Sequence, residues 1–284
     1  MRTFTFKGLF LTAVFALLGC LSIQAADDDL ITKQITIKLD KAGTLPDRIA
    51  SSKKYKITNL KIVGEINGTD WNMIREMAGR NYQESSTEGN LSVLDLSEAK
   101  IVAGGDYYYY DNLFNNKVYT SNDEIGEYAF AYCSGLTSLT LPVGITSIGE
   151  FAFSGCSGLT SLTLPAGITS IGEFAFSYCS GLTSIYEYAE KVPRIGRYAF
   201  EGCASRKCTL YVPKGTYDDY RLSGFGYFEN IVEFDATGID KTTIATDVEE
   251  VSRYSLNGQR LVGPTKGLNI VKYSDGSVKK VAVE

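Results

Sequence analysis

The sequence of 284 residues contains no histidine, and this absence excludes several kinds of chemistry. A serine–histidine–aspartate triad, a cysteine–histidine pair, a zinc site with imidazole ligands and an imidazole proton shuttle each need a histidine from the chain. Positive charge is also scarce, because 28 Lys and Arg face 33 Asp and Glu and leave a net charge of −5. Binding to nucleic acid needs a basic face for the phosphates, so nucleic acid is not an expected partner.

Long hydrophobic runs are missing as well. Beyond the N-terminus the sequence has no stretch of 18 apolar residues, and a membrane-spanning helix needs about 20. We therefore expect no integral membrane span in the mature chain. The composition is otherwise that of a folded protein, because 44% of the residues are hydrophobic and only 21% are charged, which is unlike a disordered chain.

The N-terminus has the layout of an export signal over residues 1–25. Positive charge at Arg2 and Lys7 precedes an apolar segment that is too short to span a membrane, and a small-residue cleavage site ends at Ala25. The sequence LLGC, which ends at Cys20, resembles a bacterial lipobox, so lipidation of Cys20 is the alternative. We favour cleavage after Ala25, because one lipobox position fits poorly. Both interpretations predict an exported protein, either at the cell surface or extracellular.

A repeat of 23 residues determines the expected fold. Residues 125–147 and 148–170 differ at only 4 of 23 positions, residues 171–184 begin a third copy, and a degenerate fourth copy starts at Ile195. Each full copy contains the pattern LxxLxL, in which alternate side chains of a short strand point inward. One coil buries too little apolar surface to fold alone, so the coils must stack into a solenoid and both ends need caps.

The repeat resembles the BspA-type leucine-rich repeats of bacterial surface proteins. The matching features are LTSLTLP, ITSIGEFAF and a cysteine at the same position of each copy. The strong resemblance covers residues 125–213, and a weaker one extends over 55–103 and 208–234. Members of this family are typically exported, non-enzymatic and associated with adhesion to host matrix proteins or to other cells. The resemblance implies the same properties here.

The fold class is therefore predicted as α/β, a leucine-rich-repeat solenoid with parallel strands, an N-terminal α+β cap and a small C-terminal β meander. In the cap we expect a helix over 71–78, capped by Thr69 or Asp70. Leu94 lies 45 residues before Leu139, close to two periods, so an insertion is expected to replace one coil. The expected boundaries are 26–103 for the cap, 104–124 for an aromatic insertion loop, 125–213 for the repeats, 214–236 for a C-terminal cap, 237–249 for a linker and 250–284 for the β domain.

The last segment alternates expected strands, at 268–273 and 278–283, with turn signals such as Asn257-Gly258. It resembles the C-terminal sorting domains used in type IX secretion by Gram-negative gut and oral bacteria. The matching stretches are YSLNGQRL, KGLNIVKYSDG and KKVAVE. The alternative is a small domain without a sorting role.

Cysteine occupies the same position in successive repeats, at Cys133, Cys156, Cys179 and Cys203. Equivalent side chains on adjacent coils point in one direction, so they do not face each other as a disulfide requires. We expect a ladder of free, buried thiols, and four thiols on one ladder fit a metal poorly. Whether Cys203 forms a local bridge with Cys208 stays open.

The strand residues between the inward leucines point outward and form the first candidate binding site. One column contains Thr140, Thr163, Tyr186 and Tyr211. Solenoids commonly bind partners on such extended faces, and tyrosine combines apolar area with a hydroxyl group. The alternative is that threonine and tyrosine are present only because they form strands well.

Four consecutive tyrosines in the insertion are the second candidate: Tyr107, Tyr108, Tyr109 and Tyr110. One interpretation is an exposed aromatic binding loop. The other, which we favour, is an irregular coil whose tyrosines partly pack on the edge of the solenoid.

Glu187 conflicts with the repeat pattern. It aligns with Leu141 and Leu164, which point inward, and a buried carboxylate without a partner is costly. The third and fourth copies are 24 residues apart, and this spacing favours a local slip of the coil. The alternative is that Glu187 pairs with a base such as Arg194 or Arg197.

Together these features predict a non-enzymatic, exported binding protein, either a cell-surface adhesin or a protein-interaction scaffold. The candidate acids have no specific spacing, so we expect no catalytic residue, no cofactor and no metal. The expected partners are host extracellular proteins or other surface proteins. The alternatives are a surface protein that binds glycans and a structural surface component without a specific ligand.

Overall fold

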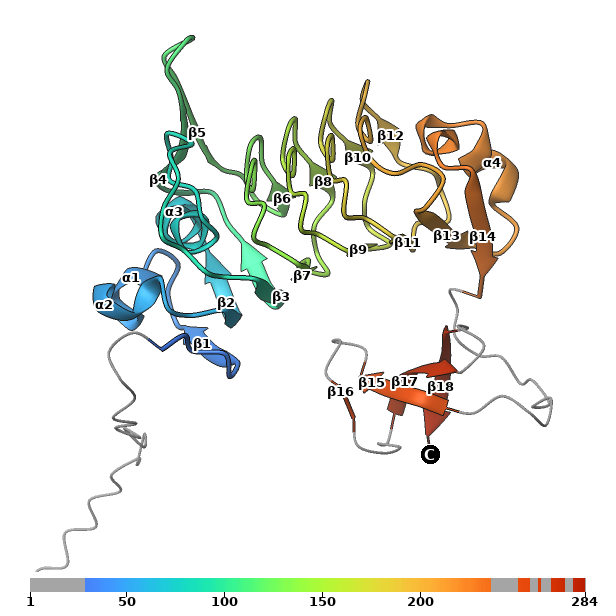
Figure 1. The fold of residues 1–284 in the computed structure, drawn as a ribbon, viewed down its shortest axis with the longest axis horizontal. Helices are drawn as coiled ribbons and strands as arrows, with labels where there is room; N and C mark the ends of the chain where they lie inside the picture. Colours follow the sequence, from blue (N-terminus) through green and yellow to red (C-terminus); the bar gives the residue numbers. More distant parts are fainter. Residues whose placement is uncertain (1–28, 236–249, 256–259, 262–266, 274–277, 284) are drawn as a thin grey trace, which may run out of the picture.

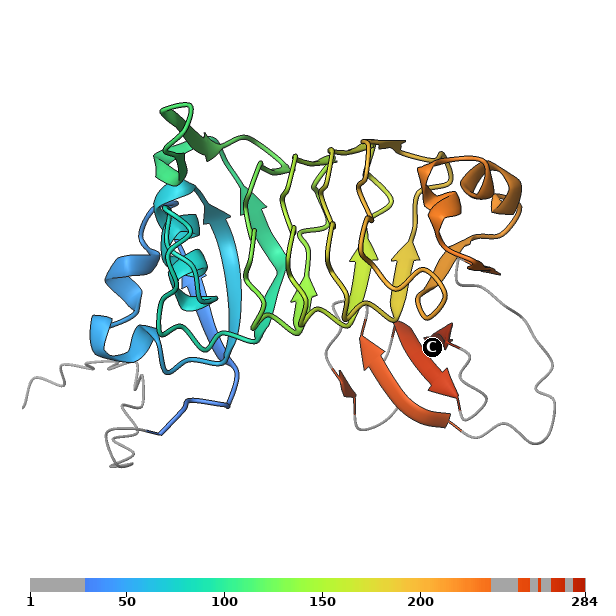
Figure 2. The same cartoon turned by 45° about the horizontal axis from the view of Figure 1, so that its top comes forward.

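The computed structural model describes residues 29–235, 250–255, 260–261, 267–273 and 278–283. The expected export signal with Cys20, the linker 237–249 and the turn at Asn257-Gly258 lie outside the described residues. Figure 1 shows coils stacked side by side between two caps, and Figure 2 shows the same stack turned by 45°. Every helix in the described ranges is too short or too polar to cross a membrane.

Parallel strands run from one cap to the other. An eight-stranded sheet has the order β1-β2-β3-β7-β9-β11-β13-β14, and all its neighbours are parallel. This arrangement confirms the predicted leucine-rich-repeat solenoid. The strands are β1 (Ile35–Leu39), β2 (Asn59–Ile66), β3 (Val93–Ile101), β7 (Ser138–Thr140), β9 (Ser161–Leu164), β11 (Ser184–Glu187), β13 (Thr209–Pro213) and β14 (Asn230–Phe234).

Each coil adds a second, shorter strand to a parallel sheet of four with the order β12-β10-β8-β6. A tight turn follows each short strand, and the coils approach closely there: a Cβ at Gly149 would lie only 2.6 Å from the backbone N of Glu127. Glycine is therefore required at this position of the repeat. The short strands are β6 (Glu124–Ile125), β8 (Ser147–Ile148), β10 (Ser170–Ile171) and β12 (Arg194–Ile195).

Identical side chains form ladders inside the coils. Successive phenylalanine rings stack with centroids 5.0–5.5 Å apart, and all are buried. Such stacking adds about 0.5–1.5 kcal/mol per pair beyond the burial of apolar area. The rings belong to Phe130, Phe153, Phe176 and Phe200.

The cysteine ladder is buried and free, as predicted. Cys156 Sγ donates to the carbonyl oxygen of Phe130 at 3.1 Å, and the next two cysteines repeat this bond one coil further on. Cys203 and Cys208 are both free, so they form no local bridge. Burial raises the pKa of the Cys133 thiol to about 11, and that of Cys203 to about 12.

Side chains from the longest helix of the N-terminal cap donate hydrogen bonds to the first coil. In the repeats, the N–H groups of one turn donate to carbonyls of the next coil, as Phe130 does to Ala152 at 2.6 Å. The carbonyls of the first coil therefore need donors from the cap. Trp71 Nε1 donates to Ala129 O at 3.1 Å, and the buried guanidinium of Arg75 donates to the same oxygen at 3.0 Å.

The helices of this cap are α1 (Leu45–Arg48), α2 (Ser51–Lys54) and α3 (Gly68–Met77). The residue that caps α3 is Asn67, and not Thr69 or Asp70 as expected. The Asn67 side chain accepts from Thr69 N, while the Asp70 carboxylate accepts from Asn67 N. Asp70 thus acts as the second partner of a capping box. It is fully buried, and it also accepts from Leu45 N at 2.8 Å.

The insertion is a hairpin and not the irregular loop we expected. Strands β4 (Gly104–Asp111) and β5 (Asn116–Thr120) pair antiparallel, and the hairpin extends away from the coils in Figure 1. Strand β3 pairs directly with β7, with Leu94 opposite Leu139. The hairpin therefore leaves the sheet continuous, as the spacing of the two leucines predicts.

The C-terminal part closes the stack and adds a separate sheet. Helix α4 (Tyr217–Arg221), the short 3-10 helix η1 (Gly224–Tyr227) and β14 form the closing cap. The last four strands form an antiparallel sheet with the order β16-β15-β17-β18. The predicted small β domain is therefore present, but its strand order is not that of a simple meander, because β15 pairs with β17 and leaves β16 at the edge. They are β15 (Glu250–Ser255), β16 (Arg260–Leu261), β17 (Gly267–Tyr273) and β18 (Val278–Val283).

Candidate functional site

The outer face of the eight-stranded sheet aligns the predicted column of side chains. Parallel pairing places Thr163 opposite Tyr186, and Tyr186 opposite Tyr211. Thr140 lies two residues after Ser138, which pairs with Ser161, so it belongs to the same column. Alternation along each strand sends these side chains outward while the leucines between them are buried.

The column ends in four aromatic residues that we call the tyrosine patch: Tyr186, Tyr188, Tyr211 and Phe234. The rings of Tyr186 and Tyr211 stack at 4.5 Å with an interplanar angle of 6°. Phe234 meets Tyr186 edge-on at 6.4 Å and Tyr188 edge-on at 5.1 Å. The four rings therefore form one contiguous aromatic surface.

The tyrosine patch offers hydroxyl groups in a partly apolar setting. Its residues are half-buried. Burial, followed by the proximity of Tyr211 and Tyr188, raises the pKa of Tyr186 to about 12. The hydroxyl therefore stays protonated at neutral pH and can donate a hydrogen bond. The C-terminal sheet contacts the edge of the patch, because Lys280 Nζ lies 4.8 Å from the centroid of the Tyr188 ring.

The rest of this face is polar and mostly neutral. Ser184 Oγ donates to Ser161 Oγ at 2.9 Å. At the N-terminal end, Lys61 pairs with Asp95 at 3.3 Å and with Glu98 at 2.7 Å, so these charges are already matched. The aromatic end is therefore the strongest candidate for a binding site on the sheet.

The insertion tyrosines are placed differently from the exposed-loop interpretation. Tyr108 and Tyr109 are only 1% and 7% exposed, so they do not offer a surface to a ligand. The Tyr108 hydroxyl donates to Glu127 O at 2.9 Å and thereby helps to cap the first coil. Tyr107 and Tyr110 are half-buried, and their rings contact each other at 6.2 Å. The structure therefore favours the packing role for the buried pair.

Glu187 occupies the leucine slot without any slip of the coil. It pairs in register with Leu164 and is fully buried, so the predicted slip is wrong. Its Oε1 accepts from Ala189 N at 3.0 Å, while its Oε2 has no hydrogen-bond partner. The predicted alternative of an Arg194 or Arg197 partner is wrong as well. Burial raises the pKa of Glu187 to about 8.

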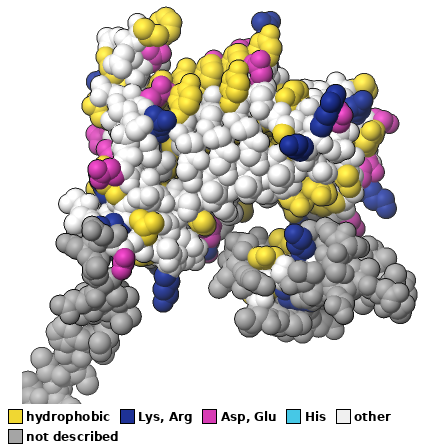
Figure 3. Space-filling view, viewed as in Figure 1, with side chains coloured by type: hydrophobic (Ala, Val, Ile, Leu, Met, Phe, Trp, Pro, Cys, Tyr) yellow, Lys and Arg dark blue, Asp and Glu magenta, His cyan; other side chains and the backbone are white. Residues whose placement is uncertain are grey.

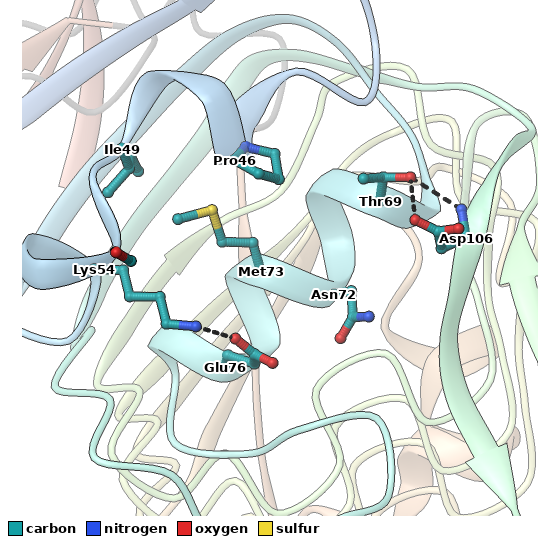
Figure 4. A pocket seen from close by; sticks show the side chains of 9 residues that line it. Pro46, Ile49, Lys54, Thr69, Asn72, Met73, Glu76 and Asp106 are labelled. Carbon is teal, nitrogen blue, oxygen red and sulfur yellow. Dashed lines mark hydrogen bonds and ion pairs between the residues drawn. The ribbon is translucent and has the colours of Figure 1, made fainter.

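An open cavity of about 290 Å³ lies between the short helices of the N-terminal cap and α3 (Figure 4). Its charged groups are already paired, because Lys54 donates to Glu76, and Thr69 Oγ1 donates to Asp106 Oδ2 at 2.9 Å. Sequence reasoning did not identify this cavity. Asn72 Oδ1 also lines the cavity and has no hydrogen-bond partner in the described part of the chain. The cavity is a weaker candidate than the tyrosine patch because its charged groups are already paired.

A second aromatic surface was also missed. Figure 3 shows hydrophobic side chains in a row along the coil edge beside the β4–β5 hairpin. The signal in the sequence is the first aromatic residue of [FY]AF in each repeat, which recurs with the period of the coil.

Among the described residues, no group of three metal-ligating side chains could hold a metal ion. The absence of enzymatic activity stays a prediction.

The fold is a leucine-rich-repeat solenoid, and a comparison with protein families shows which kind of repeat its central part is similar to. Residues 103–219 match the family model described as BspA type leucine rich repeat region, in six copies. The search of curated proteins found no match. A solved structure of a leucine-rich repeat protein from Bacteroides ovatus is 22% identical, with a TM-score of 0.38. The similarity covers 70% of this chain and 42% of that protein.

Proposed function

We propose that this protein is an exported, surface-located scaffold that binds another protein through the outer face of its eight-stranded sheet. The observation that carries the proposal is the tyrosine patch, in which Tyr186 and Tyr211 stack at 4.5 Å. Tyrosine is enriched at binding hot spots, because a rigid ring offers apolar area at a low entropic cost.

The proposed role is adhesion to host extracellular proteins or to other surface proteins. The match of residues 103–219 to BspA-type repeats supports this role, because that type of repeat is typical of surface proteins. The half-buried tyrosines next to the neutral hydroxyl column also suit a protein partner, since such a surface has little charge to desolvate.

The proposal is tested with the double variant Tyr186→Ala/Tyr211→Ala against a panel of immobilised, purified extracellular-matrix proteins. We expect the unmodified protein to bind at least one member saturably, and the double variant to bind at least about tenfold more weakly, since hot-spot side chains contribute 2 kcal/mol or more. The control is Tyr217→Ala, which removes an exposed tyrosine outside the patch.

Three results would contradict the proposal. Saturable binding to a glycan array without binding to any protein would favour a surface glycan-binding protein. Equal loss of binding in the double variant and in the control would show that the patch is not the contact. If neither assay gives saturable binding, the chain is a structural component without a specific ligand.

A further inference from the structure

The coil edge opposite the eight-stranded sheet carries a second set of stacked aromatic rings, which we call the turn stripe. Adjacent ring centroids are 4.9–5.2 Å apart, with interplanar angles of 25° or less. At its N-terminal end the buried Tyr109 of the hairpin stacks on the first ring at 4.2 Å. The turn stripe consists of Tyr128, Phe151, Phe174 and Tyr198.

The backbone of the turn stripe is unusual for aromatic residues. All four residues have left-handed φ angles, between 52° and 56°. This conformation costs free energy for any residue with a Cβ, and bulky side chains rarely adopt it. Glycine or asparagine would be the ordinary choice, yet every coil has Phe or Tyr. Such retained strain points to a role for the rings.

Further tyrosines widen the stripe. Tyr132 and Tyr178 are 46% and 60% exposed, and each leans over a glycine of the next coil. A Cβ at Gly155 would lie 2.7 Å from the Tyr132 ring, and a Cβ at Gly202 would lie 2.7 Å from the Tyr178 ring. At this position of the repeat, tyrosine and glycine thus alternate from coil to coil. Each glycine leaves space for the tyrosine ring of the preceding coil, so apolar rings cover a broad part of this edge.

A row of carboxylates runs beside the rings. Glu127, Glu150 and Glu173 each precede a residue of the turn stripe and follow one another with the period of the coil. None of them has a salt bridge or a side-chain hydrogen bond within the described part of the chain. Burial raises the pKa of Glu150, and the charges of Glu127 and Glu173 raise it further. The three carboxylates therefore have no positively charged partner among the described residues.

We propose that this edge binds a basic segment of a partner protein, in which Lys or Arg head groups pair with the carboxylate row while their aliphatic stems pack on the turn stripe. Long cationic side chains combine these two properties. Arg197 occupies the glutamate position of the fourth coil, so the site favours a segment with cations over three coils and an acidic or neutral residue at the fourth.

Other occupants fit this edge less well. Sugars stack on ring faces, whereas the faces of the turn stripe are largely covered by neighbouring rings. Anionic lipid head groups and nucleic-acid phosphates would be repelled by the carboxylates. A second copy of the chain has a net charge of −5 and would place like charges together. Charge complementarity therefore selects a basic protein segment.

The first test uses a fluorescein-labelled hexa-arginine peptide and fluorescence anisotropy at low salt. We expect saturable binding to the unmodified protein and at least about tenfold weaker binding to Glu127→Gln/Glu150→Gln/Glu173→Gln. The matched control, Glu88→Gln/Glu190→Gln/Asp219→Asn, loses the same charge from exposed positions elsewhere and should bind almost as tightly as the unmodified protein. Equal loss in both triple variants, or no binding to the unmodified protein, would overturn the proposal.

A double variant tests the contribution of the exposed tyrosines without changing charge. Tyr132→Gly/Tyr178→Gly introduces the residue that the alternate coils already have at this position, so the left-handed backbone is retained. We expect peptide binding to weaken several-fold while the cooperative thermal transition is kept. Unchanged binding would show that the Tyr132 and Tyr178 rings do not take part. Binding through the tyrosine patch should be unaffected by any of these variants, so the two sites are tested separately.

Discussion

At the residue scale, Glu187 places an ionisable group inside the apolar interior of the stack. It is fully buried, and its Oε1 accepts a backbone hydrogen bond while Oε2 has none. Burial raises its pKa to about 8 from an ordinary value of 4.5. Because the folded protein binds this proton more tightly than the unfolded chain, the contribution of Glu187 to the free energy of unfolding is fully present below pH 4.5 and is lost as the pH rises through 8.

The variant Glu187→Gln isolates this effect, because glutamine stays neutral and keeps an acceptor oxygen for Ala189 N. Between pH 5 and pH 9 we expect the unmodified protein to lose on the order of 4 kcal/mol more than the variant. Urea unfolding at both pH values measures the difference. Glu190→Gln is the control, since Glu190 is exposed. Parallel pH profiles for the protein and Glu187→Gln would show that the carboxylate does not titrate in this range.

At the scale of the element, one coil is the unit that repeats in space as well as in sequence. The turns bond coil to coil, as Phe130 N does to Ala152 O and Phe153 N does to Ala175 O. The threonine hydroxyls add similar bonds: Thr160 Oγ1 donates to Thr137 O, and Thr183 Oγ1 donates to Thr160 O. Each junction between adjacent coils therefore has the same contacts, and the stability of the stack is close to a sum over these junctions.

Deletion of residues 148–170 removes one complete coil and rejoins the chain with an unchanged local sequence. We expect the protein to fold, with Phe130 stacked on Phe176, and the melting temperature to fall by less than about 10 °C. Circular dichroism and thermal unfolding measure both outcomes. Deletion of residues 148–158 is the control, because half a coil breaks the register and should abolish cooperative unfolding. Loss of folding in the full-coil deletion would contradict equivalent interfaces.

At the scale of the whole molecule, the export prediction concerns segments outside the described residues. Mass spectrometry of the protein isolated from cells should show an N-terminus at Ala26, because the signal ends in a small-residue cleavage site. The variant Ala25→Asp disrupts that site and should retain residues 1–25. A lipid-modified N-terminal Cys20 would establish the alternative anchor. The C-terminal mass also tests the proposed sorting role, since loss of residues 250–284 is expected for a removable sorting domain.

The outward column of the sheet face could be predicted from the sequence, whereas the turn stripe could not. Alternation within LTSLTLP assigns Thr163 to the outside and its leucine neighbours to the inside, and the structure agrees. The turn stripe depends on left-handed φ angles at aromatic residues such as Phe151, and residue preferences favour glycine there. The burial of Tyr108 and Tyr109 depends on how the hairpin packs against the first coil, and no local pattern encodes that packing.

Near-identical segments with one period can pair their backbone hydrogen-bonding groups and bury their leucines only by stacking in register. The periodicity alone was therefore sufficient to predict the solenoid, the buried cysteine ladder and the outward column of threonine and tyrosine. The three-dimensional structure was needed for the fate of Glu187, the donors that cap the first coil and the exposure of the turn stripe. These features arise where distant segments meet. The continuous parallel hydrogen bonds hold Glu187 in the leucine slot despite its polar carboxyl group, and the cap supplies Trp71 and Arg75 to carbonyls more than fifty residues away.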